Sequence, residues 1–130
     1  MSSVVVEALE DTFLSAKARG HEVLCEIPME KEAQPATLSP PEYLLSALGF
    51  CIGLYVERYC MKQNISMKGM KVNITSKSAT NPRRIGKILF EIDMPIPLSE
   101  KQREGILAAA KTCYLHNTLL SPPDIDIILK

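Results

Sequence analysis

Apolar and polar residues alternate in two groups of segments along this chain. The alternating segments are Val4–Leu9, Thr12–Ala18, His21–Ile27, Gly69–Lys77 and Ile85–Met94. A period of two residues is typical of β-strands that bury one face. Turn residues separate these segments at Glu10–Asp11, Arg19–Gly20 and Ala79–Arg84. The pattern therefore predicts a three-stranded meander first and a long β-hairpin later in the chain.

The apolar run from Tyr43 to Val56, interrupted only by Ser46, predicts a helix between the two groups of strands. Ser39 stands before two prolines and Glu42, and a hydroxyl, proline and acid in this order favour a helix N-terminus. We expect the helix to end at about Gln63. A membrane-spanning helix needs about twenty apolar residues. This shorter run predicts a buried central helix and no membrane span.

A second helix and a last strand are predicted in the remainder of the chain. Ser99 and Gln102 have the spacing of a capping box, and the helix they open should reach about Thr112. Cys113–Leu120 follows as a turn or short helix, and Asp124–Leu129 alternates like a strand. The predicted order is βββ-α-ββ-α-β, an α+β fold. At 130 residues, positions 1–130 are expected to form a single domain.

The charge balance argues against nucleic acid as a partner. Fifteen Lys and Arg balance fifteen Asp and Glu, and the pI is near 6.7. A phosphate-binding surface usually carries a basic excess. The short apolar run at Val4–Val6 has no basic flank before it, so no signal peptide is predicted.

The apolar central helix needs cover on both flanks, and the chain has little other helix to provide it. A second subunit would supply the cover. Ser46, Gly49 and Gly53 put small residues along one side of the helix, where another backbone can come close. We therefore expect a homodimer in which the two central helices cross near these residues.

Four cysteines, at positions 25, 51, 60 and 113, are too few for a disulfide scaffold, so we expect free thiols in the cytoplasm. Cys51 lies among apolar positions of the central helix, where a free cysteine is either a packing residue or a reactive group. Cys60 is interpreted as a packing residue, and nothing in the pattern around Cys25 indicates a function. Cys113 and His116 form a Cys-x-x-His pair, but no second close pair completes a zinc site. Neither a metal nor an organic cofactor is predicted.

Two segments resemble the motifs of a known family. Ser39-Pro-Pro-Glu-Tyr-Leu-Leu-Ser-Ala-Leu-Gly-Phe-Cys51 is similar to the Pro-x-Glu-Leu-Leu-x-Ala-Leu-Gly-x-Cys segment of the OsmC/Ohr family, the osmotically inducible and organic-hydroperoxide-resistance proteins. Cys113-Tyr-Leu-His-Asn-Thr-Leu resembles the second motif, Cys-Pro-Val-His-x-Thr-Leu. The resemblance covers about Ala16 to Leu129. It is greatest to the short redox-protein branch.

The resemblance implies a two-cysteine mechanism. Cys51 would attack a hydroperoxide, and Cys113 would resolve it as a disulfide. Arg19 would favour the Cys51 thiolate, with Glu42 as the partner of that arginine. Glu42 stands nine residues before Cys51, one fewer than in the peroxidases of the family, and Tyr114 replaces the usual proline. The family also forms intertwined homodimers with shared active sites.

The resulting hypothesis is a dimeric thiol-dependent hydroperoxide reductase, or a related thiol redox protein, that acts in oxidative-stress defence. A dithiol electron donor would reduce it again. The alternative is a non-enzymatic protein of the same fold, which would bind a small hydrophobic ligand at the dimer interface. In that protein, the cysteines would be packing residues.

Overall fold

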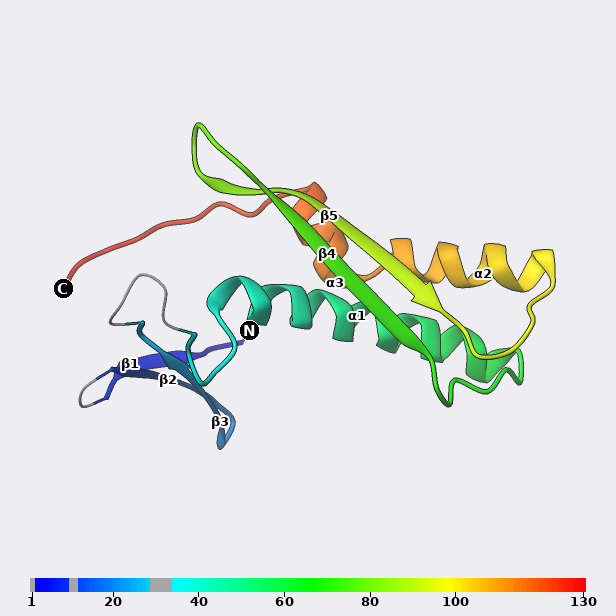
Figure 1. The fold of residues 1–130 in the computed structure, drawn as a ribbon, viewed down its shortest axis with the longest axis horizontal. Helices are drawn as coiled ribbons and strands as arrows, with labels where there is room; N and C mark the ends of the chain where they lie inside the picture. Colours follow the sequence, from blue (N-terminus) through cyan, green and yellow to red (C-terminus); the bar gives the residue numbers. More distant parts are fainter. Residues whose placement is uncertain (1, 10–11, 29–33) are drawn as a thin grey trace. The chain divides into compact units, whose positions relative to one another are not determined.

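The computed structural model of the chain describes residues 2–9, 12–28 and 34–130. These residues form two compact units, one up to Leu44 and one from Leu45 onward. Figure 1 follows the chain through three strands, a long helix, a hairpin and two further helices. The predicted mixture of helices and strands is thus confirmed as an α+β fold.

The first unit contains an antiparallel sheet in the order β1 (Val5–Ala8), β2 (Phe13–Ala18) and β3 (His21–Glu26). The turn between β2 and β3 is made by Arg19 and Gly20, whose φ angles are 52° and 82°. Glycine adopts a positive φ without steric strain, which explains why a glycine occupies position 20 of this turn. The predicted meander is confirmed, whereas the turn predicted at Glu10–Asp11 lies outside the described residues.

The long helix α1 (Pro40–Lys62) begins and ends with local hydrogen-bonding motifs. At its start, the backbone N–H of Glu42 donates to Ser39 Oγ at 3.3 Å, and Ser39 N–H donates to the Glu42 carboxylate at 2.9 Å. At its end, Asn64 has a φ of 55°, and the N–H of Ile65 donates to the carbonyl of Cys60 at 2.8 Å. These are a capping box and a Schellman-type C-terminus. They explain why the observed bounds are close to the predicted ones.

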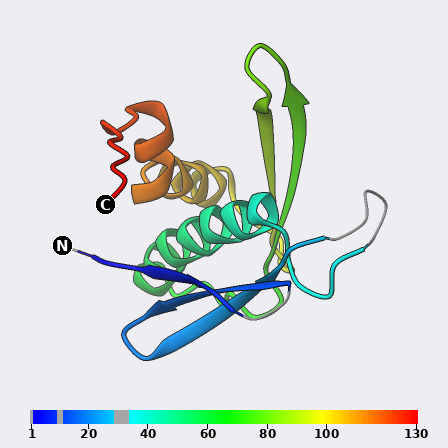
Figure 2. The ribbon, with the colours of Figure 1, turned by 90° about the vertical axis from the view of Figure 1, so that its left-hand side faces the viewer.

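The second unit has a core shared by α1, α2 (Glu100–Lys111) and the antiparallel hairpin of β4 (Lys71–Ala79) and β5 (Arg84–Asp93). Apolar side chains from all of these elements meet there. The buried members of this core are Ile52, Val56, Cys60, Ile65, Ile106, Ala110 and Cys113. Figures 1 and 2 show the tip of the hairpin projecting away from the helices of this unit. Among the described residues, β4 and β5 pair only with each other.

Two helical glycines allow neighbouring elements to approach α1 and α2 closely. A Cβ atom at Gly105 of α2 would overlap the ring of Tyr59 on α1. A Cβ atom at Gly49 of α1 would lie 2.6 Å from Cδ1 of Ile74 on β4. The small side of α1, predicted to face a second subunit, is therefore occupied in part by β4 of the same chain.

The chain beyond α3 (Tyr114–Leu120) differs from the prediction. Asp124–Leu129 was expected to form a strand, but residues 122–130 have no strand pairing in the structure. Figure 1 shows this segment as a trace that leads away from α3. Ile127 is 93% exposed and Leu129 is fully exposed. A strand needs a hydrogen-bonded neighbour, and among the described residues no other segment pairs with this one.

By length and composition alone, α1 could cross a membrane. Leu48, Ile52, Val56 and Cys60 are nevertheless buried in the protein. The apolar character of this helix is thus accounted for, at least on that side, by packing within the fold.

Candidate redox site

The second unit brings together two cysteines that are far apart in the sequence. Cys51 lies in α1, and Cys113 lies between α2 and α3. Cys51 packs against the buried core that contains Cys113, and the Cys51 thiol raises the pKa of Cys113, so the two side chains lie near each other. Both are free thiols. Spacing alone did not predict that these two residues would lie near each other, and their pairing as a disulfide stays a prediction.

Cys113 is held in place by its backbone and by the core. It is the N-cap residue of α3, and its Sγ accepts a hydrogen bond of 3.2 Å from the backbone N–H of His116. Its side chain is fully buried. Burial raises the pKa of the thiol above its ordinary value, and the Cys51 thiol raises it further. The backbone N–H groups of His116 and Leu115 oppose this shift because they stabilise the thiolate.

Cys51 is the more accessible of the two thiols. It is partly exposed and packs against the edge of the core together with Tyr55. One turn beyond, the guanidinium carbon of Arg58 lies 5.1 Å from the centre of the Tyr55 ring. The helix face that carries Cys51 therefore continues into an aromatic ring and a fixed positive charge. An external reagent has a path to Cys51 that it does not have to Cys113.

The other two predicted site residues, Arg19 and Glu42, belong to the first unit. Arg19 is exposed in the turn between β2 and β3. The Glu42 carboxylate accepts the Ser39 N–H in the capping box of α1, and this hydrogen bond lowers the pKa of Glu42. Glu42 thus has a structural role that the sequence pattern of a helix start already indicated. The approach of Arg19 and Glu42 to Cys51 remains a prediction.

The remaining cysteines lie in different surroundings. Cys60 is fully buried in the core, as its interpretation as a packing residue predicted, and burial raises the pKa of its thiol. Cys25 is partly exposed on β3. Within the described part of the chain, no three His, Cys, Asp or Glu side chains are grouped to hold a metal ion. His116 approaches Cys113 through its backbone, and that role was not predicted.

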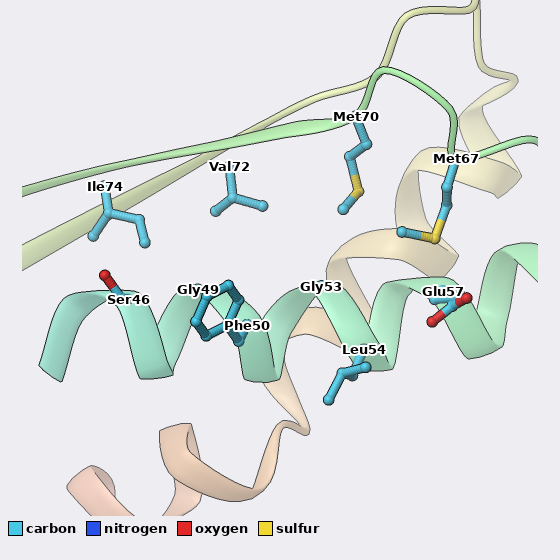
Figure 3. A pocket seen from close by; sticks show the side chains of 10 residues that line it. All are labelled: Ser46, Gly49, Phe50, Gly53, Leu54, Glu57, Met67, Met70, Val72 and Ile74. Carbon is cyan, nitrogen blue, oxygen red and sulfur yellow. The ribbon is translucent and has the colours of Figure 1, made fainter. Parts of the chain in front are cut away.

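An open apolar groove of about 720 Å³ runs along another side of α1. Figure 3 shows Met70, Val72 and Ile74 extending towards the helix, with Phe50 and Leu54 on the helix itself. Phe50 is 73% exposed and Leu54 is 57% exposed. The groove was not predicted, because the small residues of α1 were expected to contact a second helix. The alternation of Val72 and Ile74 on β4 was the available signal that a strand would cover this side.

The chain thus combines an α+β fold around a long core helix with two neighbouring thiols. The sequence profile of the OsmC-like proteins matches residues 32–128 of the chain. That is well over half of its length, and the chain belongs to this family, which includes the OsmC/Ohr proteins. No curated protein matches the chain.

Solved structures of OsmC-like proteins have the same fold. An OsmC-like protein from Mycoplasma pneumoniae is 22% identical, with a TM-score of 0.78 over 94% of this chain and 89% of its own. A protein of Psychrobacter arcticus 273-4, assigned to the osmotic stress and detoxification response, is 21% identical, with a TM-score of 0.80 over 91% and 88%. The organic hydroperoxide resistance protein OhrB of Bacillus subtilis is 17% identical, with a TM-score of 0.68 over 100% and 98%. At these identities the likeness shows the fold.

Proposed function

We propose that the protein is a thiol-dependent hydroperoxide reductase with Cys51 as the peroxidatic residue and Cys113 as the resolving residue. The carrying observation is that the partly exposed Cys51 packs against the core that contains the buried Cys113 and that the Cys51 thiol acts on the pKa of Cys113. Membership of a family that includes a hydroperoxide resistance protein supports a role in redox stress. We expect the protein to act in the cytoplasm, where thiols are kept reduced.

The proposed reaction uses only the two thiols and the peroxide. The Cys51 thiolate attacks the terminal oxygen of ROOH, the O–O bond breaks, and RO⁻ takes up a proton and leaves as ROH. Cys51 is then a sulfenic acid. The Cys113 sulfur attacks the Cys51 sulfur, the S–O bond breaks, and the hydroxyl leaves as water with the Cys113 proton. Two thiols have lost two electrons to the peroxide, and a dithiol donor restores them.

The test is to treat reduced protein with cumene hydroperoxide and, separately, with hydrogen peroxide, and then to map disulfides by peptide mass. We expect a Cys51–Cys113 disulfide, with Cys25 and Cys60 still reduced. Cys51→Ser should abolish peroxide consumption, whereas Cys60→Ser, the matched control, should retain it. A Cys51→Ser protein that consumes peroxide as fast as the parent would refute the assignment, as would a disulfide that involves Cys60.

Activation of Cys51 is proposed to depend on Arg19, with Glu42 as its partner. A thiol in partly apolar surroundings needs a nearby positive charge to ionise at neutral pH. The measurement is the pH dependence of Cys51 alkylation in the parent and in the Arg19→Ala and Arg58→Ala variants. We expect the profile of Arg19→Ala to move to higher pH. An unchanged profile for Arg19→Ala would remove its proposed role, and a shift in Arg58→Ala alone would transfer that role to Arg58.

We also propose that a second copy of the chain covers the apolar groove on α1, which makes the protein a homodimer. The exposed Phe50 and Leu54 beside the groove, and the unpaired apolar segment at residues 124–129, support a partner with the same chemistry. Gly49→Leu is a poor probe of this interface because Ile74 of the same chain occupies the space at Gly49.

Light scattering should give the mass of two chains. Leu54→Glu should lower that mass, whereas Leu107→Glu, a similarly exposed leucine on α2, should leave it unchanged. A monomeric parent would contradict the dimer. That monomer could also bind an apolar fluorescent dye in the groove, and the Leu54→Glu variant could fail to bind it. This result would support the alternative, a protein that binds a hydrophobic ligand.

A further inference from the structure

The two sulfur atoms of the proposed disulfide lie in unequal surroundings. Cys113 is fully buried, and its Sγ accepts the His116 N–H at 3.2 Å. Cys51 is partly exposed on α1. In thiol–disulfide exchange, the rate depends on access to the attacked sulfur and on the stability of the thiolate that leaves. The structure describes both the access to each sulfur and the groups that would stabilise each thiolate.

We infer that the reducing thiol attacks the Cys51 sulfur and expels Cys113, so that the mixed disulfide of the regeneration step forms on Cys51. This inference rests on the proposed Cys51–Cys113 disulfide. Access favours Cys51 because no surface of Cys113 is open to a reagent. The step adds a direction to the reaction, since either sulfur of a symmetric disulfide would serve equally well.

The surroundings of Cys113 also favour its departure as a thiolate. The backbone N–H groups of His116 and Leu115 act on the Cys113 sulfur and favour its charged form. A sulfur that leaves as a thiolate would therefore already accept the hydrogen bond of the His116 N–H. Burial opposes this charge, so the His116 N–H is needed to stabilise it. The backbone of α3 thereby has a chemical use beyond ending the loop after α2.

The atoms and electrons of the step balance with a thiol reductant. R–S⁻ attacks Cys51 Sγ and forms an R–S–S–Cys51 bond. The electron pair of the broken Cys51–Cys113 bond passes to Cys113 Sγ, which then takes up a proton. A second thiol, the other sulfur of a dithiol donor, attacks the R sulfur of the mixed disulfide. This attack breaks the bond between the donor and Cys51. Cys51 leaves as a thiolate that takes up a proton, and the donor leaves as its own disulfide.

The first test maps the adduct. The disulfide is formed with cumene hydroperoxide, treated briefly with limiting 2-mercaptoethanol, quenched with acid, and digested for peptide mass. We expect the adduct on Cys51 to exceed that on Cys113 by about tenfold or more. Equal adducts, or an excess on Cys113, would overturn the inference. If peroxide forms no disulfide, diamide can form it, so failure of the proposed function is seen separately from failure of the direction.

The second test removes one donor to the leaving sulfur. His116→Pro lacks the N–H that donates to Cys113 Sγ and should slow reduction by 2-mercaptoethanol by about fivefold, the value of one hydrogen bond. Tyr114→Pro is the matched control: a proline at the first helical position is well tolerated, and it should leave the rate unchanged. Circular dichroism checks that both variants are folded. An unchanged rate in folded His116→Pro would remove the role of this backbone group.

Discussion

The sulfur of Cys113 has a structural role besides the chemical role that we propose for it. It accepts the His116 N–H at the start of α3, a position usually held by Ser, Thr, Asp or Asn. Cysteine is not among the residues that normally mark a helix start. This explains why the sequence pattern left Cys113–Leu120 open as a turn or a short helix.

Cys113→Ser should therefore be more stable than Cys113→Ala. Serine retains an acceptor for the His116 N–H, whereas alanine leaves that group without its bond, and loss of an N-cap costs about 1 kcal/mol. Urea unfolding of the two reduced variants measures the difference. Equal free energies of unfolding would show that the hydrogen bond to Cys113 contributes nothing to the stability of α3.

The buried thiols predict a loss of stability at high pH. Burial raises the pKa of both Cys60 and Cys113, so the folded chain holds these protons more tightly than the unfolded chain does. Their contribution is complete below the ordinary thiol pKa of about 8.5 and disappears as the pH rises through the raised values of the folded state. Urea midpoints from about pH 7 to 10 should fall, and should fall less in Cys60→Ala. The same fall in both proteins would contradict the prediction for Cys60.

At the scale of elements, the crossing of α1 and α2 depends on Gly105. An Ala in place of a helical Gly usually stabilises a helix by about 1 kcal/mol. Here the added Cβ would meet the Tyr59 ring, which packs against the core.

We expect Gly105→Ala to lower the free energy of unfolding by about 1–3 kcal/mol, the typical cost of overpacking. Thermal and urea unfolding measure this effect. Adding Tyr59→Leu should recover part of the loss because it removes the ring. A Gly105→Ala protein that is more stable than the parent would show that Tyr59 moves aside freely.

Most elements could be predicted from local patterns because their causes are local. Ser39 and Ser99 begin helices through hydrogen bonds within one turn, and the strands follow a period of two. The proximity of Cys51 and Cys113 is different, since it depends on how α2 packs against α1. Packing of this kind leaves no mark in spacing or composition. Only the resemblance to a family indicated it.

At the scale of the whole molecule, the segment after α3 behaves like a strand that lacks a neighbour. Ile127 is 93% exposed, so its side chain contributes almost nothing to the stability of the single folded chain. If a second copy pairs with this segment, Ile127→Asp should weaken the dimer. Sedimentation at several concentrations is the measurement, with Asp126→Asn from the same segment as control. An unchanged dissociation constant in Ile127→Asp would place the interface elsewhere.

The β4–β5 hairpin has a consequence for solubility. Open strand edges are sites of aggregation, and lysines are a common protection against it. Lys77 of β4 lies directly opposite Lys87 of β5, beside the irregularity in register between Lys77 and Ser78. Like charges facing each other across a sheet destabilise it. Pairing is therefore weaker at this point of the hairpin, and the same two charges oppose the pairing of its edges with strand edges of other molecules, which would otherwise build fibrils.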